Sequence, residues 1–351
     1  MVKGKSLRHA APWVSSALLL AGLATPVLAR GFEDESLTLR LPAALSRFAT
    51  YGDVAGLGGA SAGSKWASSI NPASVAWEPL AGDLRLAFSP QYSSLTFENG
   101  SRLDVCAEAF TWDLGKFGVI QPALAQIRGN TATTRQGLDF RMDMDYAQVQ
   151  WAKRFGDDWA LGANLNFAKS ETRYDLGPLD IDVSESDGET YGFRLGTLHR
   201  PAPRLLAGLV FDYAFSPGRT TLFDFMGTGV GDIRVKDTTH QYVLRPGVSY
   251  EYAKDSAVYV DYQYGAFRDE TGHLEVHRFY TGVDHRLFDG LFLRGGTAMD
   301  VRGNTAWAVG LGIYPSERVS IDVGYQQDMF PELGPEFGRS RTLTISVGIT
   351  F

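Results

Sequence analysis

The last ten residues of the chain, TLTISVGITF, alternate strictly between polar and apolar positions. A period of two sends neighbouring side chains to opposite faces of a β-strand, so this stretch predicts a half-buried strand. The apolar face holds Leu343, Ile345, Val347, Ile349 and Phe351. The other face carries only threonine, serine and glycine.

The same alternation recurs along the chain from about residue 82 onward. For example, Val258 and Val260 alternate with Tyr259 and Asp261. Fourteen such stretches can be placed, and closed bacterial barrels require an even number of strands. The predicted strands lie near 82–97, 101–113, 116–128, 137–155, 158–174, 186–200, 204–217, 238–253, 256–268, 274–288, 290–300, 304–314, 317–328 and 339–351.

The connections between these stretches differ in length in a regular way. Every second connection is a short turn, at 114–115, 156–157, 201–203, 254–255, 289 and 315–316. The others vary and include the long ones, near 175–185, 218–237 and 329–338. Outer-membrane barrels have short turns on one side and longer loops on the other, whereas a soluble sandwich has no reason to sort its connections. The sequence therefore predicts an all-β fold, a transmembrane antiparallel β-barrel of about 14 strands over residues 82–351, with both termini on the periplasmic, short-turn side.

Charged and aromatic positions extend this picture. Asp139, Arg141, Asp143 and Asp145 alternate with the apolar stretch from Leu138 to Tyr146. In a membrane barrel the charged face is expected to line the lumen while the apolar face meets lipid. Aromatic residues near the short turns predict an interfacial girdle. They are Trp151, Phe155, Trp159, Phe288, Phe292 and Tyr314.

Residues 1–29 predict a signal peptide. A positively charged start is followed by an apolar run from Trp13 to Ala24 and by the small-residue cleavage site Val27-Leu28-Ala29. The apolar run is shorter than the ~20 residues that a membrane-spanning helix needs. We therefore expect an exported protein of the bacterial outer membrane that has no helical span.

The charge of the chain disfavours nucleic acid as a partner. Three of the 33 lysines and arginines lie in the leader, so the mature chain, with all 40 acidic residues, carries a net charge of about −10. Phosphate binding needs a basic face instead. The single cysteine, Cys106, excludes an intramolecular disulfide and is expected to be a small apolar residue of a strand.

Motifs for catalysis, metals or nucleotides are not found in the sequence. The glycine-rich stretches 56–59 and 227–231 lack both GxGxxG spacing and the lysine of a phosphate-binding loop. His273 and His277 stand four residues apart without a nearby third ligand, and no histidine can be tied to a nucleophilic serine. We expect no enzyme activity, no cofactor and no metal.

Two features predict where a ligand could enter or leave such a barrel. Pro122 falls inside the third predicted strand and cannot donate to the ladder, which predicts either a harmless bulge or a gap in the wall. Pro246, in the eighth, allows the same two interpretations. Apolar side chains also gather in the long connections, where they form either a hydrophobic binding surface or loops that pack on themselves. They are Leu176, Leu179, Leu222, Phe223, Phe225 and Met226, with Met329, Phe330, Leu333 and Phe337 in the last connection.

Residues 52–77, GDVAGLGGASAGSKWASSINPASVAW, show neither strand alternation nor a helical stripe. The segment is rich in glycine and alanine and contains Asn71-Pro72-Ala73 near its end. Such a segment before a barrel of about 14 strands resembles the outer-membrane superfamily of long-chain fatty-acid and hydrophobic-compound transporters, which includes the shuttle barrel of the type IX secretion system. In that superfamily the N-terminal segment forms a small hatch that plugs the lumen. The terminal Phe351 resembles the C-terminal signature that the barrel-assembly machinery of the outer membrane recognises.

The resemblance implies a hatch over residues 30–81 and passive transport of hydrophobic small molecules, fatty-acid-like or aromatic, with a lateral opening near Pro122. The alternative is a non-transporting scaffold or secretion-associated barrel that binds periplasmic or surface proteins, while the plug disfavours a general diffusion pore. The expected partners are outer-membrane lipid, a hydrophobic ligand and, through Phe351, the assembly machinery. The residues that match the hatch are Gly56, Gly58, Gly59, Asn71, Pro72 and Ala73.

Overall fold

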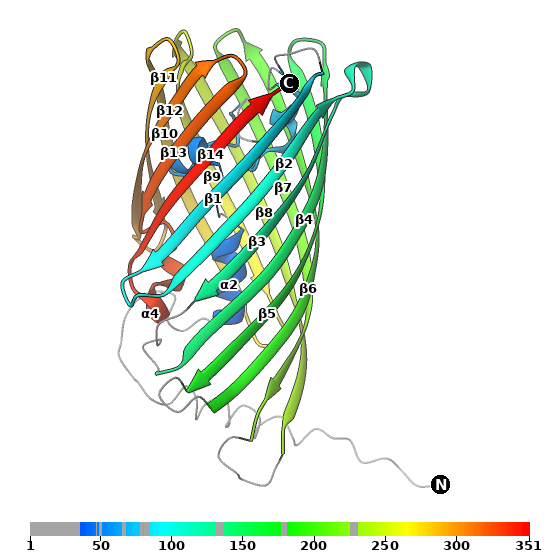
Figure 1. The fold of residues 1–351 in the computed structure, drawn as a ribbon, viewed down its shortest axis with the longest axis vertical. Helices are drawn as coiled ribbons and strands as arrows, with labels where there is room; N and C mark the ends of the chain where they lie inside the picture. The colour runs from blue at the N-terminus through cyan, green and yellow to red at the C-terminus, as the bar shows by residue number, and fades with distance from the viewer. Residues whose placement is uncertain are drawn as a thin grey trace.

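The computed structural model describes residues 36–46, 48, 51–64, 68–77, 80, 84–130, 137–176, 181–224 and 231–351. In this part of the chain fourteen antiparallel strands, each paired with its neighbour in sequence, close into a barrel through the pairing of β14 with β1 (Figure 1). The predicted fold class, a transmembrane antiparallel β-barrel of about 14 strands, is confirmed. The leader, residues 1–29, lies outside the described residues.

The strands vary in length around the barrel. They are β1 (Leu86–Phe97), β2 (Arg102–Asp113), β3 (Val119–Asn130), β4 (Asp139–Phe155), β5 (Trp159–Leu176), β6 (Ile181–Ala202), β7 (Leu205–Leu222), β8 (Ile233–Ala253), β9 (Ser256–Arg268), β10 (His273–Phe288), β11 (Leu291–Asp300), β12 (Thr305–Ser316), β13 (Val319–Gln327) and β14 (Ser340–Thr350). The helices are α2 (Leu37–Leu45), α3 (Gly52–Gly56), η1 (Pro72–Ala76), η2 (Gly115–Phe117), η4 (Pro331–Leu333) and α4 (Gly334–Phe337). None of the helices in the described part of the chain is long and apolar enough to cross a membrane.

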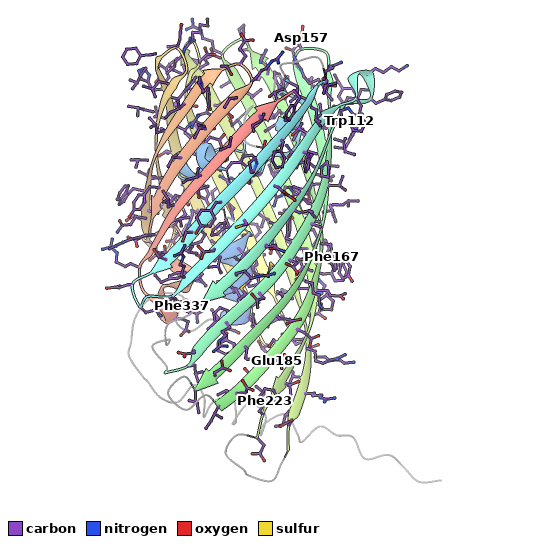
Figure 2. All side chains as sticks on the ribbon, in the orientation of Figure 1. Trp112, Asp157, Phe167, Glu185, Phe223 and Phe337 are labelled. Carbon is purple, nitrogen blue, oxygen red and sulfur yellow. The ribbon has the colours of Figure 1, made fainter. Side chains whose placement is uncertain are left out.

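The outside of the barrel is apolar over most of its height. Leu165, Val260 and Val309 are 64%, 49% and 50% exposed. Exposed aromatic side chains border this belt at two heights, with Trp112 near the short turns and Phe167 further along the wall, before Glu185 and Phe223 are reached (Figure 2). Such a belt between two aromatic girdles is the surface that a transmembrane barrel presents to lipid.

Two members of the predicted girdle face the other way. The rings of Phe292 and Tyr314 pack at a tilt with centroids 4.9 Å apart, and the Tyr314 hydroxyl donates to buried Asp322 at 3.0 Å. The girdle prediction is therefore wrong for these two residues, because an aromatic ring near a turn satisfies a luminal polar cluster equally well. Trp151, Phe155, Trp159 and Phe288 are exposed on the outside as predicted.

The predicted orientation of the charged stripe on β4 is also wrong. Phe140 and Met142 are buried inside the barrel, whereas Arg141, Asp143 and Asp145 are exposed on the outside. Strands β4 to β8 contain 17 to 22 residues and extend past their neighbours at the long-connection end (Figure 1). Because this extension lies beyond the aromatic girdle, its outer face meets water. Charged side chains therefore face outward here and apolar side chains face the lumen, the reverse of the arrangement within the membrane.

Three short helices, α2, α3 and η1, lie inside the barrel. We call the described part of residues 36–77 the plug. Helix α2 lies at the long-connection end, where Thr38 donates to Asp269 in the β9–β10 connection at 2.9 Å. Helix η1 packs against β3 to β6 nearer the short turns. The plug therefore runs lengthwise through the lumen, and its first described residues lie at the long-connection end. The N-terminus, which the sequence predicts on the short-turn side, lies outside the described residues.

Candidate functional site

Four pairs of glycines line the described wall where the plug crosses it. Each pair lies directly across two neighbouring strands, and a Cβ on either Gly208 or Gly296 would overlap a carbonyl oxygen of the plug, that of Ala62 or Leu57. Backbone therefore touches backbone, which only glycine allows at so close an approach. The pairs are Gly162 with Gly196, Gly208 with Gly247, Gly282 with Gly296, and Gly310 with Gly324.

One wall carboxylate holds the middle of the plug. Asp261 on β9 accepts hydrogen bonds from the backbone N–H groups of Ser61 and Ala62, both at 2.7 Å. Arg245 on β8 donates to the same oxygen at 2.8 Å and also to the carbonyl of Gly59. Because both wall side chains are buried, the ion pair is shielded from water and fixes the position of this turn.

Asn71 organises the plug at the start of η1. Its side-chain amide donates to the carbonyls of Ala62 and Thr197 at 2.8 and 3.0 Å, and its side-chain oxygen caps the helix by accepting from Ala73. Pro72 then stands in the first helical turn, where its missing N–H costs nothing. All six hatch residues named from the sequence lie in the plug, and Gly56, Gly58, Asn71 and Pro72 contact wall glycines.

A buried charged cluster lies beside α3. Arg294 on β11 pairs with Asp322 on β13 at 2.5 Å and with Asp284 on β10 at 3.4 Å, and it donates to the Tyr314 hydroxyl on β12. Asp53 of α3 adds a third carboxylate to this one guanidinium. Burial, reinforced by the neighbouring carboxylate of Asp322, raises the pKa of Asp53 to about 7.

The last connection covers the end of the plug. Arg40 of α2 pairs with Glu336 of α4 at 2.5 Å and donates to the Glu332 carbonyl at 3.1 Å. Phe48 stacks on Phe330 with ring centroids 5.6 Å apart. The apolar residues of this connection, Met329, Phe330, Leu333 and Phe337, are all buried, so they pack inward as a lid over the plug.

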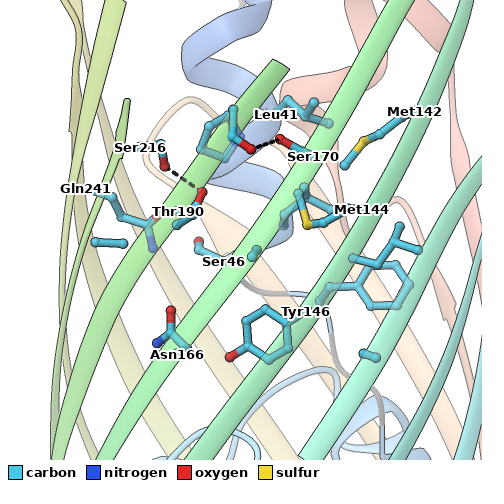
Figure 3. A pocket seen from close by; sticks show the side chains of 18 of the residues that line it. Leu41, Ser46, Met142, Met144, Tyr146, Asn166, Ser170, Thr190, Ser216 and Gln241 are labelled. Carbon is cyan, nitrogen blue, oxygen red and sulfur yellow. Dashed lines mark hydrogen bonds between the residues drawn. The ribbon is translucent and has the colours of Figure 1, made fainter. Parts of the chain in front are cut away.

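A cavity of about 410 Å³ lies between α2 and the wall formed by β2 to β8. Leu41 of α2 and Met142 and Met144 of β4 line its apolar part, while Tyr146 and Asn166 line a polar part (Figure 3). This volume is within the range of sites for small organic ligands, which are largely apolar with a few convergent polar groups. The geometry therefore suits a hydrophobic molecule held between plug and wall.

The polar part of the cavity continues into a chain of uncharged side chains. Asn166 donates to Asn164, and Asn164 donates to Gln148 at 2.8 Å. Further along the wall, Gln150 donates to Gln121, which donates to Thr111 at 2.6 Å. These amides and hydroxyls satisfy one another where the plug covers them, as buried polar groups require.

Pro122 lies on the outer face of β3, and the ladder between β2 and β3 omits two residue pairs beside it. Pairing is continuous up to Ala109–Ala123 and resumes at Trp112–Ile120 in the same register. Equivalent two-pair omissions occur beside Pro90, Pro217 and Pro246. Each follows from the N–H that proline lacks, and none shifts the register. Whether the wall opens at Pro122 stays a prediction.

The loop residues that were predicted to bind a hydrophobic ligand do not come together in the cavity. Leu176 and Leu222 end β5 and β7, and Phe223 lies at the tip of the extension, outside the set of side chains that line the cavity (Figure 2). Leu179, Phe225 and Met226 lie outside the described residues.

Sequence alternation does not single out the cavity or the glycine pairs, because glycine carries no hydropathy signal. The glycines could have been found only from their shared position on the luminal face.

No family model matches the chain, and neither does any curated protein. Solved structures do match. A Pseudomonas aeruginosa FadL homologue is 12% identical, with a TM-score of 0.59 over 86% of this chain and 98% of that one. The CymD monoaromatic hydrocarbon channel is 13% identical, with a TM-score of 0.58 over 86% and 97%. The Pseudomonas putida toluene transporter TodX is 11% identical, with a TM-score of 0.56 over 86% and 98%. This chain thus has the fold of the FadL-type outer-membrane channel barrels.

Proposed function

We propose that this chain is a passive channel of the bacterial outer membrane for hydrophobic small molecules. One observation carries the proposal: a largely apolar cavity of about 410 Å³ lies between a plug and the wall of a barrel whose outside meets lipid. The structurally similar proteins described as hydrocarbon channels and a toluene transporter support it. In the proposed route a ligand enters beneath the lid, rests in the cavity and leaves when plug or wall moves.

The side of exit is part of the proposal. The cavity reaches Ala123 and Leu124, directly after Pro122, and small side chains leave the wall thin there. A lateral exit into the bilayer would pass between β2 and β3, where the two residue pairs beside Pro122 are missing from the ladder.

We also propose that Phe351, at the end of the strand that closes the barrel, is the residue that the assembly machinery recognises.

Filling the cavity tests the function. Ala125 on β3 lines the cavity, whereas Ala147 on β4 shares the outer face with Phe167. Ala125→Trp should abolish uptake of naphthalene into vesicles that contain the purified barrel, and Ala147→Trp should leave uptake unchanged. Equal uptake by both variants and the unaltered protein would refute the channel. Stoichiometric co-purification of a protein partner without any ligand uptake would instead favour the scaffold.

A further inference from the structure

The charge of the ligand can be inferred from the cavity wall, provided that the proposed channel function holds. A carboxylate taken out of water into an apolar cavity needs a cationic partner, because an unpaired buried charge is strongly disfavoured. An uncharged molecule needs only hydrogen-bonding groups. Whether the cationic side chains around the cavity are already paired therefore indicates which ligands suit it, fatty carboxylates or neutral hydrophobic compounds.

Arg194 is the cationic side chain that points into the described cavity, and it is already occupied. Its Nη2 pairs with the Asp212 carboxylate at 2.6 Å, and its Nε donates to the same oxygen at 2.9 Å. Its Nη1 donates to the carbonyl of Ser69 in the plug at 2.6 Å. The guanidinium is thus neutralised by a wall residue and used to hold the plug.

The second arginine at the cavity, Arg219, belongs to the opposite face of the wall. It lies in register with Asp187 on β6 and with Lys236 on β8, on the face that also carries exposed Tyr191 and Phe215. Among the described residues that line the cavity, no inward cation is therefore left to receive a carboxylate.

Apart from the paired Arg194 and Asp212, most of the inward polar side chains that line the described cavity are uncharged. Tyr146 donates to Gln148 at 2.9 Å, and Thr190 and Ser216 share a hydrogen bond of 2.7 Å. Hydroxyl and amide groups of this kind can exchange partners with a hydroxyl or carbonyl of a ligand at little cost. Beside them lie Leu41, Met142 and Met144, which offer an apolar surface to the rest of the molecule.

We infer that the cavity selects uncharged amphipathic molecules, with an apolar body and a hydroxyl or carbonyl group, over fatty carboxylates. Asp212 is the residue that determines this selectivity, because it occupies the guanidinium that would otherwise bind an anionic headgroup.

Binding of two probes with the same chain, 1-dodecanol and dodecanoate, to the purified full chain at pH 8 tests the inference. At this pH the carboxylic acid is ionised. We expect the alcohol to bind at least about tenfold more tightly than the carboxylate. Equal or tighter binding of dodecanoate would overturn the inference and leave the proposed channel standing. Failure of both probes to bind would instead overturn the proposed function.

Asp212→Asn should convert the selectivity, since it frees the Arg194 guanidinium while keeping the shape of the side chain. We expect dodecanoate to bind about tenfold more tightly to this variant and 1-dodecanol to bind as before. Asp187→Asn is the matched control, because it removes one carboxylate from the outside of the same wall. The double variant Arg194→Gln/Asp212→Asn should lose the gain.

Heat-modifiable mobility, the difference in gel migration between unheated and heated samples, establishes that each variant forms the barrel. If Asp212→Asn does not fold, the comparison of the two probes on the unaltered chain still decides the inference. A folded Asp212→Asn barrel that binds dodecanoate no better than Asp187→Asn does would show that Asp212 does not set the selectivity.

Discussion

Gly296 on β11 lies against the carbonyl oxygen of Leu57 in the plug, with no room for a side-chain carbon between them. The preceding residue, Gly295, points to the outside of the barrel, where a Cβ would meet its nearest atom at 3.9 Å. Two adjacent glycines thus differ only in the face that they occupy. The same substitution at Gly295 therefore serves as a control for a substitution that disturbs the contact between Gly296 and the plug.

Gly296→Ala should loosen the plug. The added methyl group must displace plug backbone, and overpacking of this kind costs about 1–3 kcal/mol. We expect increased ion conductance across planar bilayers from a barrel that is still folded, as judged by its heat-modifiable mobility in gels. Gly295→Ala should conduct like the unaltered protein. A Gly296→Ala barrel that is no leakier than Gly295→Ala would show that the plug does not depend on this contact.

Asp261→Asn should release the turn of the plug at Ser61 and Ala62. The change leaves the buried guanidinium of Arg245 without its counterion, and breaking a buried pair in this way costs about 3–5 kcal/mol. The expected result is faster tryptic cleavage after Lys65 in the intact barrel. Asp145→Asn, which breaks an exposed pair with Arg128, is the control and should cleave at the original rate.

The plug should bind less tightly as the pH rises. Docking raises the pKa of Asp53 from 3.8 to about 7, so the docked carboxyl stays protonated where a released one is ionised. Docking stability is therefore greatest below about pH 4 and falls towards pH 7 by up to about 1.4 kcal/mol per pH unit, then levels off. Conductance measured from pH 4 to pH 8 should rise over this window.

Asp53→Asn should remove that pH dependence, because the amide is uncharged throughout. Asp157→Asn, in the exposed β4–β5 turn, should retain it. An unchanged conductance profile in Asp53→Asn would assign the pH dependence to other groups of the cluster.

Glu108→Leu should stabilise the barrel in lipid. Glu108 is exposed on the outer face of β2, opposite Leu124, which is 56% exposed within the apolar belt. A lipid-facing carboxylate is unfavourable, so its replacement should raise the free energy of unfolding by about 1 kcal/mol. Urea titration in vesicles measures this change. Glu317→Leu, in a turn exposed to water, should give no gain, and a gain there would contradict the explanation.

The alternation of side chains predicted the strand count, the antiparallel order and the sorted connections because each depends on local pattern alone. The faces of Phe140 and Asp143 could not be assigned from that pattern. Their orientation depends on where the aromatic girdle ends, and this height is set by neighbouring strands.

The site was less accessible to sequence reasoning than the fold. Asn71 and Pro72 were recognised because their spacing is a local motif. The partners of Asn71 are a carbonyl nine residues away and Thr197 on a distant strand. The neutralisation of Arg194 by Asp212 likewise joins two strands, and a sequence shows charges without showing which of them are paired.

The lengthwise course of the plug has a consequence for biogenesis. The segment from α2 to η1 occupies the lumen, and the seam between β1 and β14 encloses it. A cylinder that sealed before receiving this segment would have to admit it end-on past the lid and the buried ion pair of Arg40. Sealing of the seam around a segment already in place avoids that barrier. The architecture therefore favours an order of assembly in which the plug segment is in place before β1 pairs with β14.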